Sequence, residues 1–126
     1  MISQNYNSKF KSDLRQRCFQ FGLEVIRLTD KLPQKRSAWV ISDQVIRSSC
    51  SIGANLVEAK GSSSRLEFKK FYEISLKSAN ESKYWIELLR EAGLVPAKST
   101  DALLSELQEI TSMIASGVIK LKSKNF

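Results

Sequence analysis

The side chains of this sequence with the clearest chemical potential are its lysines and arginines, which gather at the two ends of the chain. Residues 1–36 hold eight basic and three acidic side chains and residues 118–126 hold three and none, whereas residues 37–117 hold nine and ten. Such clusters attract polyanions, and the phosphates of RNA or DNA are the obvious candidates. The alternative is that these basic residues have no ligand: lysines at chain ends increase solubility, and helix C-termini favour cations.

Catalytic chemistry is limited by composition, because the 126 residues include no histidine. This excludes Ser-His-Asp and Cys-His catalysis, histidine general bases and histidine-ligated metal sites, including the Glu-x-x-His pairs of di-iron bundles. The Arg-x4-His motif of HEPN-type ribonucleases cannot form either. The sequence also lacks a P-loop, a glycine-rich phosphate cradle and a CxxC motif. We therefore expect no enzyme activity, no metal and no cofactor.

Two cysteines, Cys18 and Cys50, are too few for a disulfide framework, and both fall in apolar-periodic stretches. Each is expected to be a small, reduced core residue.

The polar N-terminus is unlike a signal peptide, and no apolar run approaches the roughly 18 residues of a membrane span. These features predict a cytoplasmic protein that does not bind to or span a membrane. Binding of the basic first helix to an anionic membrane surface is a weaker alternative.

Hydrophobic periodicity predicts the elements that would position these residues. We expect four helices, at about 8–32, 37–60, 64–92 and 99–122. The first would be capped by Ser8 or Ser12 and ended by Pro33, and a capping box from Ser64 to Glu67 would start the third. No strand-like alternation is present and the connections are short. Residues 1–126 are thus expected to form a single domain, an all-α, up-down-up-down antiparallel four-helix bundle.

This topology brings three basic regions to one end of the bundle: the start of the first helix, the second connection and the end of the fourth helix. Windows 8–17, 58–71 and 118–126 hold eleven basic and three acidic side chains, a net charge of +8, against −1 elsewhere. Because the sequence contains no motif that recognises bases, we expect binding to be directed to the phosphates or to the shape of the nucleic acid. The candidate nucleic-acid-binding residues are Lys9, Lys11, Arg15, Arg17, Lys60, Arg65, Lys69, Lys70, Lys120, Lys122 and Lys124.

Four polar side chains fall near the apolar faces of the second and third helices: Arg47, Asn55, Glu58 and Glu81. A buried carboxylate needs a cation or several donors, which Arg47 or Arg65 could supply. We interpret the four as an inter-helix polar network that fixes register; a pocket contacting RNA or a ligand is the alternative. Small residues on the third helix predict a close helix contact at Ser75, Ser78, Ala79 and Ser82.

Several spaced positions agree with the motif of a known family: Arg47, Ser51, Ile52, Asn55, Glu58, Arg65, Phe68 and Glu81. The stretch VIRSSCSIGANLVEAKGSSSRLEFKKFYEISLKSANESKYWIELLREAGLV resembles the four-helix-bundle proteins encoded in intervening sequences of bacterial 23S ribosomal RNA genes, and the resemblance covers about residues 29–95. It implies a homopentamer arranged as a barrel around an axis. A similar bundle, the accessory protein of diversity-generating retroelements, associates with a reverse transcriptase and nucleic acid, and by that analogy a basic surface would bind RNA.

Two functional hypotheses follow. The first is a non-enzymatic, oligomeric protein that binds RNA or other nucleic acid through phosphate contacts at a basic pole. The alternative is a structural or adaptor protein that recruits a protein partner, with no direct nucleic-acid role. Its anchors would be Trp39, Tyr84 and Trp85, since aromatic side chains concentrate at interfaces. Both tryptophans could equally be ordinary core residues.

Overall fold

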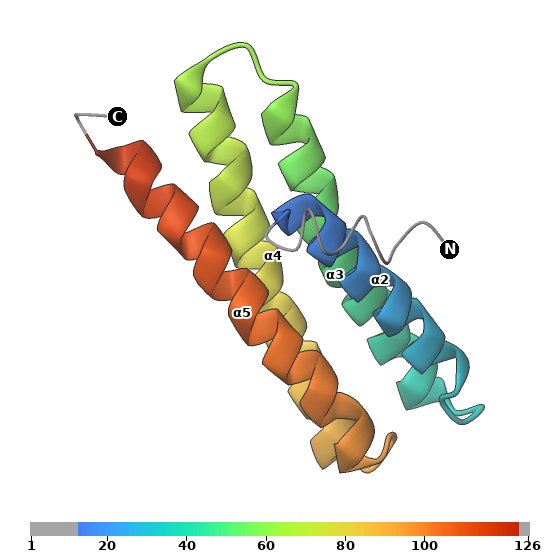
Figure 1. Cartoon of the computed structure of the whole chain (residues 1–126). Helices are drawn as coiled ribbons and strands as arrows, with labels where there is room; N and C mark the ends of the chain where they lie inside the picture. Colours follow the sequence, from blue (N-terminus) through green and yellow to red (C-terminus); the bar gives the residue numbers. More distant parts are fainter. Residues whose placement is uncertain (1–12, 124–126) are drawn as a thin grey trace, which may run out of the picture.

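The computed structural model describes residues 13–123 and consists of four helices joined by short connections (Figure 1). They are α2 (Leu14–Asp30), α3 (Arg36–Lys60), α4 (Arg65–Glu91) and α5 (Ala97–Lys122). Successive helices run in opposite directions, each packs against the next, and α2 also contacts α5. No strand occurs between residues 13 and 123. The all-α bundle predicted from hydrophobic periodicity is confirmed.

Local sequence sets where two of these helices begin. Helix α2 begins after Asp13, whose side chain accepts a hydrogen bond from the Arg15 N–H at 3.1 Å. The predicted start was earlier, and residues 8–12 lie outside the described residues. At α4 the predicted Ser64 cap is present, since the hydroxyl oxygen of Ser64 accepts a hydrogen bond from the Glu67 N–H at 3.1 Å. The Glu67 carboxylate accepts its hydrogen bond from the Ser63 N–H, at 2.8 Å, one residue before the position expected in a capping box.

The α4–α5 connection turns on Gly93, whose φ of 72° lies in the left-handed region that glycine favours. Pro96 follows and occupies the N-cap position of α5. A proline is tolerated here because the first N–H groups of a helix have no partner within the helix. Helix α5 therefore begins at Ala97, two residues before the predicted start at residue 99.

One hydrophobic core runs through the bundle. Its fully buried members include Phe21, Val25, Val45, Ile52, Ile86, Leu89, Leu107, Ile110 and Ile114. Burying each such side chain contributes about 1.5–3 kcal/mol before the entropy of ordering it is subtracted. Cys18 belongs to this core, as predicted, but the prediction for Cys50 is wrong because its side chain is exposed. Cys50 follows the buried Ser49 on α3, and one step around a helix is enough to leave the core face.

A seam of serines joins α3 to α4. The hydroxyl of Ser82 donates to the hydroxyl of Ser48 at 2.9 Å and accepts from that of Ser49 at 3.2 Å. The hydroxyl of Ser75 donates to the carbonyl of Ile52 at 2.8 Å. These side chains are buried, and small residues let helices approach closely, so the predicted close contact is confirmed. The serine hydrogen bonds also fix the register of the two helices.

Helix α2 is the shortest of the four, and its start stops short of the end of the bundle that holds the α3–α4 connection (Figure 1). A Cβ on Gly53 would lie 3.2 Å from the Cβ of Cys18, so these residues are level with each other. Arg17 bonds to Glu106, which precedes the end of α5 at Lys122 by 16 residues, or about 24 Å. The first helix therefore meets the middle of α5.

Candidate nucleic-acid interface

Basic side chains gather at the end of the bundle where α3 ends, α4 begins and α5 ends (Figure 1). We define the basic pole as Lys60, Arg65, Lys69, Lys70, Lys120 and Lys122. Windows 58–73 and 120–122 hold these six basic side chains and three acidic ones. At the opposite end, windows 24–43 and 83–106 hold seven of each sign. The surplus of positive charge is therefore confined largely to one end of the described bundle.

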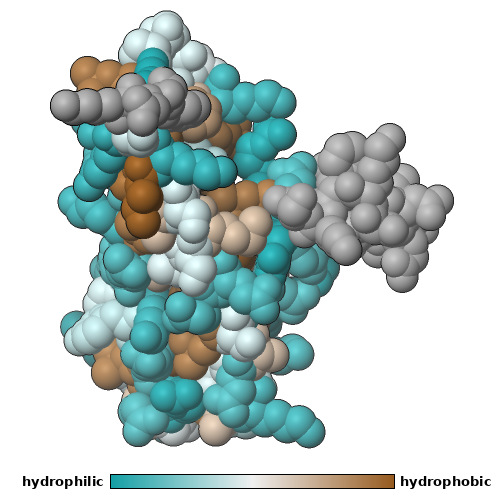
Figure 2. Space-filling view, turned by 60° about the vertical axis from the view of Figure 1, so that its left-hand side comes forward, coloured by the Kyte–Doolittle hydropathy of each residue, from teal (hydrophilic) through white to brown (hydrophobic). Residues whose placement is uncertain are grey.

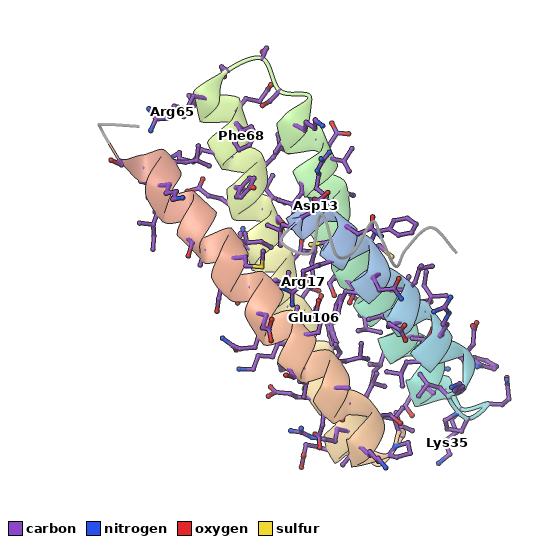
Figure 3. The ribbon with its side chains drawn as sticks, in the orientation of Figure 1. Asp13, Arg17, Lys35, Arg65, Phe68 and Glu106 are labelled. Carbon is purple, nitrogen blue, oxygen red and sulfur yellow. The ribbon has the colours of Figure 1, made fainter. Side chains whose placement is uncertain are left out.

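Arg65 ties the start of α4 to the end of α5. Its Nη2 donates hydrogen bonds to the carbonyl of Leu121 at 3.2 Å and to that of Ser123 at 2.7 Å. The last carbonyls of a helix lack partners within the helix, so a cationic donor there satisfies them and complements the helix dipole. The guanidinium is thus held against the C-terminal end of α5, and Figure 3 shows Arg65 near that end.

The lysines of the basic pole differ in their surroundings. Lys69 lies 3.9 Å from a carboxylate oxygen of Glu73, one turn further along α4. The other four are exposed, and within residues 13–123 none of their ammonium groups lies within ion-pair distance of a carboxylate: Lys60, Lys70, Lys120 and Lys122. Their charge is available to an anion from outside the chain.

Two further candidate residues lie on α2: Arg15 lines a surface hollow together with Lys60, whereas Arg17 lies away from the basic pole. Arg17 donates two hydrogen bonds to Glu106, at 2.6 and 2.9 Å, and one to Glu109 at 2.7 Å. These bonds raise the pKa of the Arg17 guanidinium above its ordinary value. Arg15 is more exposed and lies 3.9 Å from a carboxylate oxygen of Asp13. Of the predicted residues on the first helix, Arg15 therefore lies beside the basic pole and Arg17 does not.

The remaining candidates, Lys9, Lys11 and Lys124, lie outside the described residues. Near the basic pole the surface is not uniformly hydrophilic, and hydrophobic groups show among hydrophilic ones in the upper part of Figure 2. Leu66 at the start of α4 is 72% exposed and Ile119 near the end of α5 is 69% exposed. Apolar side chains are thus available beside the lysines.

The predicted polar network is only partly assembled. Arg47 forms a salt bridge with Glu81, and the same carboxylate accepts a hydrogen bond from the indole N–H of Trp85 at 2.8 Å. The Trp85 bond and then the Arg47 bond lower the pKa of Glu81 below its ordinary value. Asn55 instead bonds within α3, and Glu58 is exposed and outside this group. The prediction of one four-residue network is therefore wrong, because the buried polar contacts between α3 and α4 are made by serines.

A second surface feature, an apolar groove of about 340 Å³, lies between α2 and α3. Its lining includes Phe19, Ile26, Cys50 and Val57. Phe19 is 65% exposed and Val57 is 58% exposed. Sequence periodicity missed this groove, because it assigned Cys50 to the bundle core.

Within the part of the chain that the structure describes, no group of three or more metal-ligating side chains converges. Over the same residues, no helix combines the length and apolar character needed to cross a bilayer.

The fold and the charge distribution define a class: a small antiparallel helical bundle with one uncompensated cationic end. The chain belongs to the 23S rRNA-intervening sequence protein family, whose model matches residues 11–116, so the family membership indicated by the sequence motif is confirmed. A similar solved structure is that of a protein of unknown function from the S23 ribosomal protein family of Bacteroides thetaiotaomicron VPI-5482. It is 30% identical, with a TM-score of 0.78, covering 83% of this chain and 97% of that chain. No curated protein matches this chain.

Proposed function

We propose that this protein is a non-enzymatic, oligomeric RNA-binding protein that contacts phosphates through its basic pole. The observation that carries the proposal is the set of four exposed lysines without a carboxylate partner in the described chain. Lysines at the opposite end, such as Lys31 and Lys98, also lack an ion pair within residues 13–123, but basic and acidic side chains are equal in number there. Because the pole carries a net positive charge and the opposite end does not, the pole is the favoured place for RNA.

Self-association is the second part of the proposal, and the homopentamer implied by the family resemblance is its specific form. The apolar groove between α2 and α3 supports it, since Phe19 and Val57 are more than half exposed there. A second copy covering this groove would remove that apolar surface from water. Several basic poles in one particle would then add weak phosphate contacts through avidity. We place this function in the cytoplasm, in keeping with two free cysteines.

A charge-matched pair of variants tests the RNA proposal. The pole variant replaces four lysines by glutamine, at Lys60, Lys70, Lys120 and Lys122. The control variant removes four positive charges at the opposite end, at Lys31, Lys35, Arg36 and Lys98. Both lower the formal net charge from +7 to +3, so they differ only in where the charge is lost. Binding to a labelled single-stranded RNA of about 12 nucleotides is measured by fluorescence anisotropy at about 50 and 200 mM salt.

Each phosphate contact to a single strand contributes about 0.7 to the slope of log affinity against log salt concentration. Loss of four contacts should therefore flatten that slope by about 3. The advantage of the unmodified protein over the pole variant should shrink about 50-fold between the two salt concentrations. The control variant should keep the full slope. Equal slopes for all three proteins would refute RNA binding at this end of the bundle.

A second candidate function is that of an adaptor for a protein partner, such as the reverse transcriptase implied by the resemblance. The observation that favours it is Trp39, which is 60% exposed near the start of α3, while Trp85 is only half-buried and bonded to Glu81. An exposed tryptophan is a typical interface anchor. If Trp39→Ala leaves the thermal unfolding midpoint unchanged but abolishes capture of a purified partner, the adaptor role is favoured. Melting of the bundle by this change would exclude it.

A further inference from the structure

Phe68 lies at the basic pole between two hollows in the surface. The first hollow, of about 370 Å³, has Arg15, Lys60 and Tyr72 in its lining. The second, of about 380 Å³, is lined by Arg65, Leu121 and the serines at 62–64. Phe68 lines both hollows, so it separates two cationic depressions on one side of the pole. Figure 3 shows Phe68 and Arg65 on the first turns of α4.

The ring of Phe68 is supported from one side. It stacks on the ring of Tyr72, with the ring centres 5.1 Å apart and the planes 20° apart. Tyr72 rests in turn on α5, where a Cβ on Gly117 would lie only 2.5 Å from the Cε2 of Tyr72. The second hollow is lined by Phe68 and not by Tyr72. Phe68 is half-buried, so part of it remains open to solvent at the pole.

The charges around Phe68 fit a polyanionic strand. Arg65 is held beside the second hollow by the carbonyls of Leu121 and Ser123, and Lys60 lies in the first hollow. The acidic member of the first hollow is Asp13, which caps α2 and lies beside Arg15. Both hollows therefore offer a cation to a phosphate, with the aromatic ring between them.

We propose that Phe68 stacks against an unpaired base of single-stranded RNA, with the flanking phosphates at Lys60 and Arg65. Aromatic rings next to basic grooves bind single strands in this way, whereas the bases of a duplex are already stacked within the helix. This inference rests on the proposed function and deepens it. It assigns the pole to single-stranded rather than double-stranded RNA.

The test compares Phe68→Leu, which keeps an apolar side chain but removes the aromatic face, with Tyr84→Leu as the matched control, since Tyr84 is an exposed aromatic residue on the same helix outside both hollows. The probe is a single-stranded RNA of about 12 nucleotides containing 2-aminopurine, beside an abasic version and a duplex of equal length. Phe68→Leu should weaken single-strand binding about 10-fold at both low and high salt, because stacking releases no counterions. Tyr84→Leu and Phe68→Tyr should bind like the unmodified protein, and binding of the abasic RNA should not change with Phe68→Leu.

The outcomes separate this inference from the proposed function. If RNA binds with the slope set by the lysines but Phe68→Leu changes nothing, the stacking inference fails and phosphate binding stands. If no RNA binds, both fail. A change in native mass caused by Phe68→Leu, with RNA affinity unaltered, would make the ring a subunit contact and overturn the inference. Should Phe68→Leu not fold, 2-aminopurine fluorescence decides with the unmodified protein, since quenching on binding supports stacking and unchanged emission refutes it.

Discussion

Replacing Gly117 by alanine should destabilise the protein, although the same change at most helix positions does the opposite. Gly117 lies inside α5, one turn before Lys120, where alanine would ordinarily gain about 0.5–1 kcal/mol over glycine. Here the new Cβ would lie 2.5 and 2.9 Å from two ring carbons of Tyr72. The ring cannot retreat freely, because it is half-buried and stacked on Phe68.

The expected size follows from these opposing terms. Overpacking of this kind costs about 1–3 kcal/mol, which exceeds the gain in helix propensity. We therefore expect a net loss of about 1–2 kcal/mol in the free energy of unfolding. For a chain of this size the unfolding midpoint should fall by about 4–8 °C. Urea and thermal unfolding, followed by far-UV circular dichroism at one protein concentration, would measure both quantities.

Two controls make the reasoning refutable. Gly22 also lies inside a helix, but a Cβ there would meet only the Sγ of Cys50, at 3.9 Å, so Gly22→Ala should stabilise by about 0.5–1 kcal/mol. In a Tyr72→Ala background, Gly117→Ala should likewise become neutral or stabilising. If Gly117→Ala stabilises the unmodified protein as much as Gly22→Ala does, the ring of Tyr72 is not seated on α5. The contact by which α5 supports the stacked rings of Tyr72 and Phe68 would then be wrong.

Three further predictions follow from charges and burial. Arg17→Met should lower the free energy of unfolding by about 1–2 kcal/mol, because it leaves two glutamates of α5 without their shared partner; urea unfolding measures this, and no loss would contradict it. Cys18 should resist iodoacetamide at pH 8 in the native protein, since burial raises the pKa of its thiol to about 12, and it should react once urea unfolds the chain. Mass spectrometry of labelled peptides decides, and rapid labelling of Cys18 in the native protein would refute its burial. Glu81→Gln should lower the stability of the protein at neutral pH and leave it unchanged in acid, because bonds to the carboxylate, led by that from Trp85, lower the Glu81 pKa. The stabilisation by the carboxylate is fully present above the ordinary pKa of 4.5 and is lost as the pH falls through the lowered value. A difference in unfolding midpoint that does not change with pH would contradict this.

Helices and their order could be predicted from the sequence because those signals are local. The cap at Ser64 depends on neighbours in the chain, and α4 begins where the pattern placed it. The exposure of Cys50 was missed, because an apolar residue beside a helical stripe can face either the core or a surface groove. Periodicity gives the width of an apolar face but not which neighbour covers it.

The sequence predicted the part of the candidate site that depends on the lengths of the connections. It did not predict the part that depends on how far one helix is shifted along its neighbour. The short link between α3 and α4 places Lys60 beside Arg65, and antiparallel order brings the end of α5 to the same place. The position of Arg17 depends instead on how far α2 slides along α5, which its bonds to Glu106 report and no local pattern encodes. The serine contacts between α3 and α4 were likewise a tertiary outcome. A run of small residues predicts closeness but not which hydroxyls pair.

Native mass by light scattering, with and without a mixed RNA pool at low and high salt, tests the central claim most directly. The account predicts a particle of about 70 kDa, close to five times the 14.3 kDa of one chain, that gains mass from RNA at low salt and releases it at high salt. A single 14.3 kDa chain whose mass is unaffected by RNA at either salt concentration would contradict both the self-association and the function proposed for the basic pole.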